Sequence, residues 1–325
     1  MAPRATDAGR ELPGRRPWRS RLRPVRVRLA LAAAVVVALL CADAALLRAR
    51  VDRLDVTLTA GAGTTWVLVG TDSRAALPPG APAAEFGTVD DVPGSRADVV
   101  LVVHESAAGT HAFSVPRDLL VPEGALPSRL AVTWLDGPQA TVDALCTAGI
   151  ATDHLVAVDL AGFAATVDAA GGVDVDVAAP VRDPAAGLEL RAPGRQRVDG
   201  RTALALVRSR HPEHLVDGAW VPAPLDPDGR AATAGTVVRA LADAAGQATA
   251  RPWRLQALAW AGSGALAVDG GTSLADLAAL AGSGVPEVQV LPTAFTGGDG
   301  LVRPVSEETA EALAAAGMSC DGRVS

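Results

Sequence analysis

Carboxylate and guanidinium side chains stand at the ends of three apolar, strand-like runs of the sequence. Asp72 follows the first run, Arg96 and Asp98 precede the second, and Arg117 follows the third. Polar groups at strand ends can converge on one rim of a sheet, where α/β proteins place their sites. Two carboxylates without His or Cys partners suit Mg²⁺, which prefers oxygen ligands, and interleaved arginines suit a diphosphate. For any one aspartate alone, a turn cap or a surface pair with a neighbouring arginine is the simpler interpretation.

The elements that would position these groups follow from the hydrophobic pattern. Short apolar runs predict buried strands, and segments with a period near that of the α-helix predict helices. Their alternation predicts an α/β fold, a three-layer α-β-α sandwich with a mixed central sheet. The predicted strands are residues 66–69, 99–103, 112–115, 155–158, 173–177 and 287–291, and the predicted helices are 139–148, 162–170, 201–210, 236–245 and 306–316.

The charge of the chain is divided unevenly between its N-terminus and the rest. Residues 1–50 hold 11 Arg and three acidic residues, a balance of +8. The remaining 275 residues hold 18 Arg and 33 acidic residues, a balance of −15. Nucleic-acid binding requires positive charge on the binding face, so this acidic main part is not expected to bind nucleic acid. With 49% hydrophobic residues, the 325-residue chain can form a sizeable core.

Residues 29–47 form an apolar stretch that is interrupted only by Asp43. These 19 residues are long enough to cross a bilayer. The arginines of residues 1–28 predict a basic, disordered tail that stays in the cytoplasm. The sequence therefore predicts a single-pass signal anchor in the cell membrane, a linker at residues 48–62 and one extracytoplasmic domain at residues 63–325.

A cleaved signal peptide is the alternative to this transmembrane anchor. Residues 42–44 have the small-x-small form that a signal peptidase prefers. Lipidation of Cys41 is disfavoured, because the bulky Leu40 stands where a small residue would be expected. Under either interpretation the bulk of the chain lies outside the cytoplasm.

Several sequence blocks occur in an order that is typical of one known family. They are GTDSR at residues 70–74, RADVVLVVHE at 96–105, FSVPRDLLVP at 113–122, DHLVAVDLAGFAATVDAAGGVDVDV at 153–177, VDGRTALALVRSR at 198–210 and DGR at 228–230. Together they resemble the LytR-CpsA-Psr family of extracellular glycopolymer phosphotransferases. The resemblance covers residues 63–245, behind an N-terminal anchor of the kind this family has.

The resemblance implies a role for each of the polar side chains. Asp72 and Asp98 would hold Mg²⁺, and arginines would contact the diphosphate of the substrate. The implied catalytic contacts are Arg96, Arg117, Arg208 and Arg210, with Arg74 and Arg230 as further binding residues. Because Arg208 and Arg210 are two residues apart, they cannot share one face of a straight helix, so the helix is expected to end near them.

A lipid carrier would, by the same resemblance, lie in an apolar cavity between the sheet and the helices. Residues 140–150 and 161–170 are expected to help line this cavity. Ordinary core packing remains the alternative for any single side chain in these two segments.

The sequence also departs from the family pattern at three places. Residues 128–132 keep a cation but lack the usual Asn, and Thr233-Ala234 stand where a second Arg followed by Gln is expected. Residues 211–227 form a long loop in this interpretation, directly after Arg210. These departures bear on catalytic activity more than on the fold.

The implied function is Mg²⁺-assisted transfer of a glycopolymer from a polyprenyl-diphosphate carrier to a hydroxyl of a peptidoglycan acceptor. No residue is assigned as the general base. One alternative is a catalytically weak module that binds polyprenyl phosphate. Another is a membrane-bound regulator of transcription, which the short cytoplasmic tail and the acidic extracytoplasmic part disfavour.

Cys146 and Cys320 both lie in the predicted extracytoplasmic part, whereas Cys41 lies in the apolar stretch. An oxidising compartment can sustain a disulfide between Cys146 and Cys320, which would attach the C-terminal tail to the core. The alternative is a buried, unreactive Cys146 and a disordered Cys320.

Overall fold

The computed structural model describes residues 19–80, 82, 86–123, 126–224, 226, 228–248, 250–294 and 302–323. The chain divides into two compact units, Met1–Leu46 and Leu47–Ser325. Most of α1 (Arg19–Arg50) belongs to the first unit, and the remaining helices and strands belong to the second. Each unit is described by itself.

Helix α1 contains the one segment of the described chain that is long and apolar enough to cross a membrane, Val25–Arg50, with a mean hydropathy of 2.5. Its 26 residues span about 39 Å, more than the ~30 Å of a hydrocarbon core. The predicted anchor at 29–47 lies inside this segment. Residues 19–28 were predicted to be disordered but are helical, because Arg is a good helix former and extends a helix already nucleated in the apolar stretch. Residues 1–18 lie outside the described residues.

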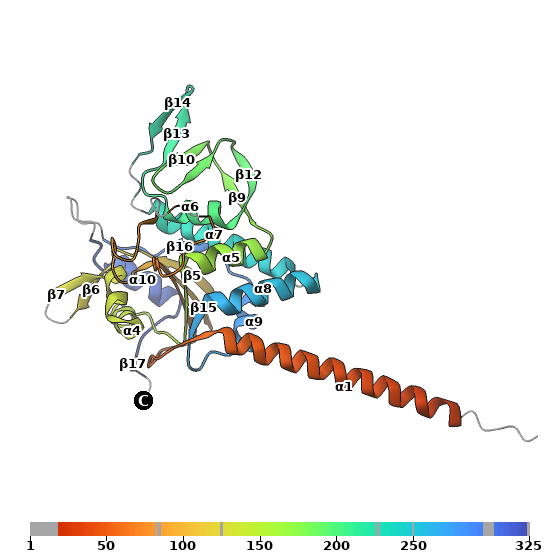
Figure 1. The fold of residues 1–325 in the computed structure, drawn as a ribbon. Helices are drawn as coiled ribbons and strands as arrows, with labels where there is room; N and C mark the ends of the chain where they lie inside the picture. Colours follow the sequence, from red (N-terminus) through yellow and green to blue (C-terminus); the bar gives the residue numbers. More distant parts are fainter. Residues whose placement is uncertain are drawn as a thin grey trace, which may run out of the picture. The chain divides into compact units, whose positions relative to one another are not determined.

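A seven-stranded mixed sheet forms the centre of the second unit (Figure 1). The pairs β1–β15, β3–β8 and β5–β16 are parallel and the other three neighbouring pairs are antiparallel. The predicted α/β fold with a mixed central sheet is therefore confirmed. The strand order is β1 (Asp52–Leu54), β15 (Leu266–Asp269), β8 (His154–Val158), β3 (Thr64–Thr71), β4 (Ala97–Ser106), β5 (Gly109–Val115) and β16 (Val288–Val290).

Helices cover both faces of this sheet and give the three predicted layers. The central strand β3 is apolar on both sides: Val67 and Val69 contact one layer, and Trp66 and Leu68 contact the other. Burial on both faces explains why its sequence is a continuous apolar run rather than an alternation. One layer holds α3 (Leu130–Thr133), α4 (Pro138–Thr147) and α10 (Glu307–Ala315), and the other holds α5 (Leu160–Ala169), α6 (Gly200–Arg208), α7 (Gly229–Ala248), α8 (Pro252–Ala265) and α9 (Leu274–Ser283).

Smaller sheets pack on the outer side of α5, α6 and α7 and form a second apolar cluster with them. In place of the predicted loop at 211–227, the chain forms the hairpin β13–β14. Asp217 and Gly218 both have positive φ, which is the geometry of a tight hairpin turn. These strands are β9 (Val173–Val177), β10 (Val181–Asp183), β11 (Leu188–Leu190), β12 (Gly194–Val198), β13 (Glu213–Val216) and β14 (Ala219–Pro222).

Residues 48–62, which were predicted as a linker, contribute strands to the folded unit. Val51 is buried and Leu54 packs on the main core, so the segment follows the edge of the sheet. The predicted last helix is present as α10, with Ser306 in a reciprocal capping box. The remaining short elements are β2 (Thr59–Ala60), β6 (Leu120–Glu123), β7 (Leu126–Arg129), η1 (Trp134–Asp136) and β17 (Gly322–Arg323).

A disulfide joins Cys146 on α4 to Cys320 after α10, with the two Cα atoms 5.3 Å apart. The predicted disulfide is therefore confirmed, and the alternative of an unpaired Cys146 is wrong. It closes a loop of 174 residues and attaches the C-terminal segment to the helix layer on one face of the sheet. Cys41 is a free thiol.

We predict that Cys146→Ala/Cys320→Ala lowers the free energy of unfolding by about 2–5 kcal/mol, because the bridge restricts a long loop in the unfolded chain. Denaturant unfolding of the full chain in detergent measures this loss. Cys41→Ala is the matched control and should leave the free energy of unfolding unchanged. Equal stability of the double variant and the control would contradict the prediction.

Candidate active site

Asp72 lies directly after β3, where its carboxylate is fixed by Arg96, the residue just before β4. Its Oδ1 accepts a hydrogen bond from the backbone N–H of Arg96 at 2.6 Å, and its own N–H donates to the Arg96 carbonyl at 3.1 Å. A β-bulge at Gly70 and Thr71 shifts the register just before this pairing. Oδ2 lies 3.3 Å from the guanidinium of Arg74 and 3.7 Å from that of Arg96. The structure thus brings three of the predicted residues together around one buried carboxylate.

Three arginines meet at Asp98, near the start of β4. Arg117 donates a hydrogen bond to Oδ1, and the Nη2 atoms of Arg210 and Arg230 lie 3.4 Å and 3.7 Å from Oδ2. These arginines come from the end of β5, the segment after α6 and the first turn of α7. Asp118 also lies 3.5 Å from Arg117. Three guanidiniums therefore face two carboxylates, and the remaining positive charge suits an anion.

Helix α6 ends at Arg208, as the spacing of Arg208 and Arg210 predicted. Asp183 at the end of β10 fixes the turn that follows. Its Oδ2 accepts hydrogen bonds from the Ser209 hydroxyl and the Arg210 N–H, both at 2.8 Å, and from the His211 N–H at 2.9 Å. Burial alone would raise the pKa of Asp183, but these hydrogen bonds outweigh it and hold the pKa below its ordinary value.

Phe86 connects Arg208 to Arg74. The guanidinium carbon of Arg208 lies 3.9 Å from the centre of the Phe86 ring, in a cation-π contact. The Phe86 carbonyl accepts a hydrogen bond from Nε of Arg74 at 2.7 Å, and Nη1 of Arg74 donates to the Asp72 carbonyl at 2.9 Å. Arg208 therefore lies beside the group around Asp72.

An apolar cavity of about 480 Å³ adjoins these polar groups. Its walls include Leu68 and Val156 from the sheet and Phe163, Leu204 and Leu241 from the helices. A pocket of this size, apolar with a few convergent polar groups, is typical of a small-molecule site. Its charged lining residues include Asp72, Asp98, Asp159, Asp183, Arg74, Arg208, Arg210 and Arg230.

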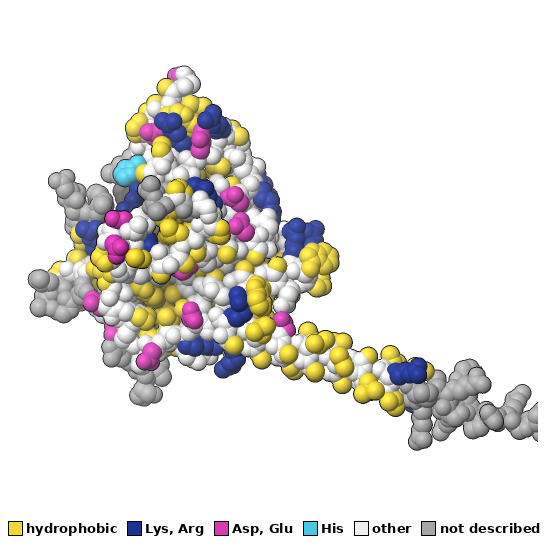
Figure 2. Space-filling view, in the orientation of Figure 1, with side chains coloured by type: hydrophobic (Ala, Val, Ile, Leu, Met, Phe, Trp, Pro, Cys, Tyr) yellow, Lys and Arg dark blue, Asp and Glu magenta, His cyan; other side chains and the backbone are white. Residues whose placement is uncertain are grey.

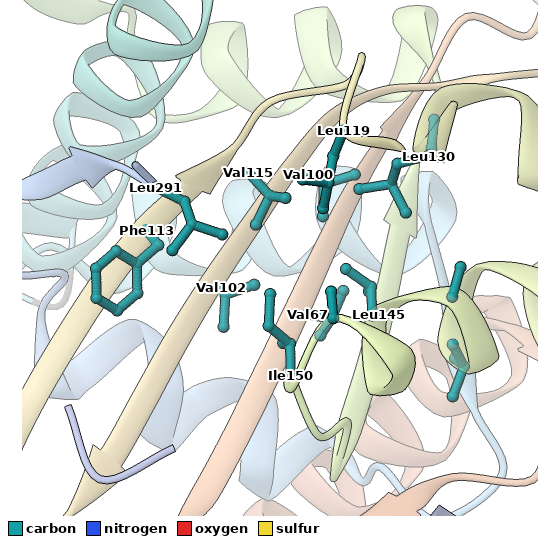
Figure 3. Packing of buried hydrophobic residues seen from close by; sticks show 14 of the residues in the cluster. Val67, Val100, Val102, Phe113, Val115, Leu119, Leu130, Leu145, Ile150 and Leu291 are labelled. Atoms are coloured by element: carbon teal, nitrogen blue, oxygen red, sulfur yellow. The ribbon is translucent and has the colours of Figure 1, made fainter. Parts of the chain in front are cut away.

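One of the two segments predicted to line the cavity lies elsewhere. Residues 161–170 do contribute to it through Phe163, but residues 140–150 belong to the opposite layer. Leu145 is fully buried against the face of the sheet that carries Val67 (Figure 3). Because β3 is apolar on both faces, the helical pattern of residues 140–150 does not indicate which face the helix covers.

A second groove is lined by arginines, two of which pair with the carboxylates. Arg96, Arg117 and Arg129 are among its lining residues. Arg96 pairs with Asp72 and Arg117 pairs with Asp98, and both of these carboxylates line the apolar cavity. The two aspartates therefore lie at the boundary between the apolar cavity and an arginine-rich groove.

The environment of Arg230 indicates that an anion would be favoured here. Burial, together with the guanidiniums of Arg210 and Arg117, lowers the pKa of Arg230 to about 10, although Asp98 and Asp118 oppose this shift. Arg230 still carries its positive charge at neutral pH. Its Nε is buried and has no hydrogen-bond partner among the described residues. A bound phosphate would supply the missing acceptor.

The carboxylates fit Mg²⁺ by the chemistry of their donor atoms. Mg²⁺ commonly takes one or two carboxylates and completes its ligands with water and substrate phosphates. In the described part of the chain, no group of three His, Cys, Asp or Glu side chains is arranged to hold a metal ion. A cation at Asp72 and Asp98 would therefore complete its ligands with oxygen atoms of water or of a bound phosphate.

Sequence reasoning missed three residues that organise the site: Asp183, Phe86 and Arg303. Phe86 gave a weak signal, because it is one of only four phenylalanines in the sequence. Arg303 is buried and pairs with Asp228 at 2.6 Å, just before α7. Asp183 and Arg303 act through contacts between distant segments, which no local pattern reveals.

The family model described as the LytR_cpsA_psr family matches residues 47–219, more than half of the chain. This chain belongs to the LytR-CpsA-Psr family. The resemblance found in the sequence is thereby confirmed. Among curated relatives, the probable cell wall biosynthesis protein LcpB of Corynebacterium glutamicum is 37% identical over 166 residues, which cover 50% of this chain and 40% of that protein. The match thus spans less than half of the length of LcpB.

Solved structures of LytR-CpsA-Psr proteins have the same fold. The LytR-Csp2A-Psr enzyme from Actinomyces oris is 38% identical and superposes with a TM-score of 0.69, covering 84% of this chain and 99% of that one. TagT bound to LI-WTA is 18% identical with a TM-score of 0.55, covering 78% of this chain and 89% of that one. The likeness to TagT concerns the fold alone.

We predict that Asp183→Asn lowers the free energy of unfolding by about 1–3 kcal/mol near neutral pH, because the charge of a carboxylate that accepts five hydrogen bonds is lost. The folded-state pKa of Asp183 lies below its unfolded value. Its contribution is therefore complete above pH ~4 and is lost as the pH falls through the lower folded-state value. Denaturant unfolding at neutral and acidic pH measures the difference between wild type and variant.

The exposed Asp176→Asn is the matched control for Asp183→Asn and should change stability by less than about 0.5 kcal/mol. The difference in free energy of unfolding between wild type and Asp183→Asn should shrink at acidic pH. If it is undiminished at the lowest pH at which the chain folds, the stabilising role of the Asp183 charge is contradicted.

Proposed function

We propose that this chain is a membrane-anchored phosphotransferase that moves a glycopolymer from a polyprenyl-diphosphate carrier to a hydroxyl of a peptidoglycan acceptor. The observation that carries the proposal is the position of Asp72 and Asp98 between an apolar cavity and an arginine-rich groove. A prenyl chain matches the cavity, a diphosphate matches the arginines, and a glycan acceptor matches the polar groove. The relatives support it, since LcpB is named for cell wall biosynthesis and the Actinomyces oris protein is named an enzyme.

In the proposed topology α1 anchors the chain in the cell membrane, with its arginine-rich N-terminus in the cytoplasm and Leu47–Ser325 outside. The disulfide between Cys146 and Cys320 supports this placement, because disulfides persist in oxidising compartments. The positive charge before the apolar segment supports the same orientation.

In the proposed reaction, an acceptor hydroxyl attacks the phosphorus atom next to the glycan. A bond forms between the acceptor oxygen and this phosphorus, the phosphoanhydride bond breaks, and polyprenyl monophosphate leaves. The hydroxyl proton passes to solvent. The broken phosphoanhydride supplies the driving force, so the reaction needs no nucleotide outside the cell.

The arginines hold the diphosphate from two sides in this proposal. Arg208, Arg210 and Arg230 contact it from the cavity, and Arg96 and Arg117 contact it from the groove. Fixed guanidiniums of this kind stabilise the negative charge that develops on the phosphates in the transition state.

Asp72 and Asp98 would hold Mg²⁺, which supplies Lewis-acid stabilisation of phosphate oxygens when it is bound. Within the described residues both carboxylates pair with guanidiniums, at Arg74 and Arg96 for the first and at Arg117, Arg210 and Arg230 for the second. A diphosphate offers these arginines a more highly charged partner. Its binding would therefore release carboxylate oxygens for the cation.

A second candidate is a module that binds polyprenyl phosphate without transferring a glycan. The three guanidiniums around Asp98 favour it, because a carboxylate so engaged is a poor metal ligand until the arginines move. The missing Asn at residues 128–132 also favours a binding module. Turnover with a lipid-linked glycan and an acceptor separates an enzyme from a binding module.

We predict that Asp98→Asn lowers kcat for Mg²⁺-dependent transfer about 100-fold. The reason is that the variant loses the negative charge that would hold Mg²⁺ against the phosphates in the transition state. Asp72→Asn should act in the same direction. Asp174→Asn is the matched control: Asp174 also pairs with two arginines, Arg195 and Arg197, but lies outside the apolar cavity. Equal activity of Asp98→Asn and Asp174→Asn would remove Asp98 from the catalytic machinery.

A second test addresses the cavity. Val238 on α7 lines it, and Val238→Trp should raise KM for a long-chain polyprenyl-diphosphate substrate about tenfold, or ~1.4 kcal/mol, because the indole occupies space for the prenyl chain. Activity toward a short-chain carrier should change little. Thr236→Trp, on the exposed side of the same helix, is the control. An unchanged KM for the long carrier would show that the prenyl chain lies elsewhere.

A further inference from the structure

Helix α8 presents two tryptophans on one exposed face. Trp253 is 71% exposed and Trp260 is 44% exposed. Seven residues separate them, about two helical turns, so they lie on the same side of the helix. Arg251 and Arg254 flank Trp253, and residues 251–265 contain no acidic side chain. Figure 2 shows hydrophobic and arginine side chains gathered over this part of the molecule. Exposed apolar patches with a charged rim mark interaction surfaces.

The face that carries Trp260 is in contact with the residue that ends α1. The guanidinium carbon of Arg50 lies 3.9 Å from the centre of the Trp260 ring. Nε of Arg50 donates to the Ser263 hydroxyl at 3.2 Å, and Nη2 donates to the Trp260 carbonyl at 3.3 Å. A Cβ atom at Gly264 would collide with the Arg50 guanidinium, so the glycine makes room for this contact.

Chain connectivity determines where this contact must lie if α1 crosses a membrane. The apolar part of the helix ends at Leu47, and Arg48 and Arg50 follow in its last turn. Three helical residues rise about 4.5 Å, so Arg50 cannot be far from the end of the apolar segment. Arginines at the end of a membrane helix place their charge in the headgroup region, because burying it in hydrocarbon is costly. The Trp260 ring, stacked on Arg50, lies at the same level.

We propose that the Trp253–Trp260 face of α8 lies on the surface of the bilayer that α1 crosses, with the indoles at the headgroups and the arginines against anionic phospholipid. Tryptophan is enriched at membrane interfaces for this reason, and each arginine near an anionic surface adds attraction. The inference rests on the proposed membrane anchor and extends it, since it assigns a second, non-spanning contact with the lipid.

This contact bears on how a lipid carrier reaches the site. Helix α8 packs against α5 and α7. Those two helices contribute Phe163 and Leu241 to the apolar cavity. With α8 on the bilayer, the helices that line the cavity stand next to the membrane from which a prenyl chain must come.

Fluorescence quenching of the full-length chain in vesicles tests the proposal. The vesicles contain phosphatidylglycerol and phosphatidylcholine with bromine atoms near the top of the acyl chains, which quench only tryptophans at the interface. All variants carry Trp18→Phe, so that the N-terminal tail gives no signal. Trp253→Phe/Trp260→Phe should lose the quenched component of the emission. Trp220→Phe, on the hairpin β13–β14, is the matched control and should retain it.

Flotation of the same vesicles separates the anchor from the α8 contact. Flotation of the chain with the vesicles supports the membrane anchor. If the chain floats but the double variant is quenched as strongly as its parent, the α8 proposal is overturned. Protection of the indoles from aqueous iodide without quenching by the brominated lipids would identify a second protein copy as the occupant and would also overturn it. A chain that does not float with the vesicles contradicts both proposals.

Discussion

The negative charge of Asp98 allows three arginines from distant parts of the chain to lie side by side. Without it, Arg117, Arg210 and Arg230 would repel one another in a partly buried setting, where charges are only weakly screened. Each arginine also brings its own segment: the end of β5, the turn after α6 and the start of α7. Asp98 therefore holds this part of the rim together, and a bound diphosphate would compete with it for the same guanidiniums.

The cavity depends on a difference between the two faces of the sheet. One face is closed by side chains of α3, α4 and α10, and the disulfide holds the C-terminal segment there. On the other face, α5, α6 and α7 leave the apolar space beside Leu68 and Val156. These helices bury their outer sides against the smaller sheets, so they do not need to fill that space to be stable. The layer that lines the cavity is supported from outside.

Local patterns predicted the strands and the polar residues at their ends, because β3, β4 and β5 are buried and their apolar runs stop where the polar blocks begin. The end of α6 near Arg208 also followed from spacing alone. The layer of α4 could not be predicted, since an apolar helix face fits either side of a sheet that is apolar on both. Asp183 and Arg303 were missed because their partners are remote in sequence. The sequence predicts a loop at 211–227, whereas the chain forms a hairpin at 213–222, for which Asp217-Gly218 is a turn sequence.

The central claim is that phosphate next to the glycan moves to an acceptor hydroxyl while the prenyl phosphate leaves. A carrier with a radiolabel in the phosphorus next to the glycan, and none in the other, tests this directly. With the full-length chain, Mg²⁺ and peptidoglycan, the account predicts that the label appears in the peptidoglycan as a phosphodiester and that unlabelled polyprenyl monophosphate is released in equal amount. Label that stays on the lipid, with the carrier bound but intact, would contradict transfer and identify the chain as a binding module.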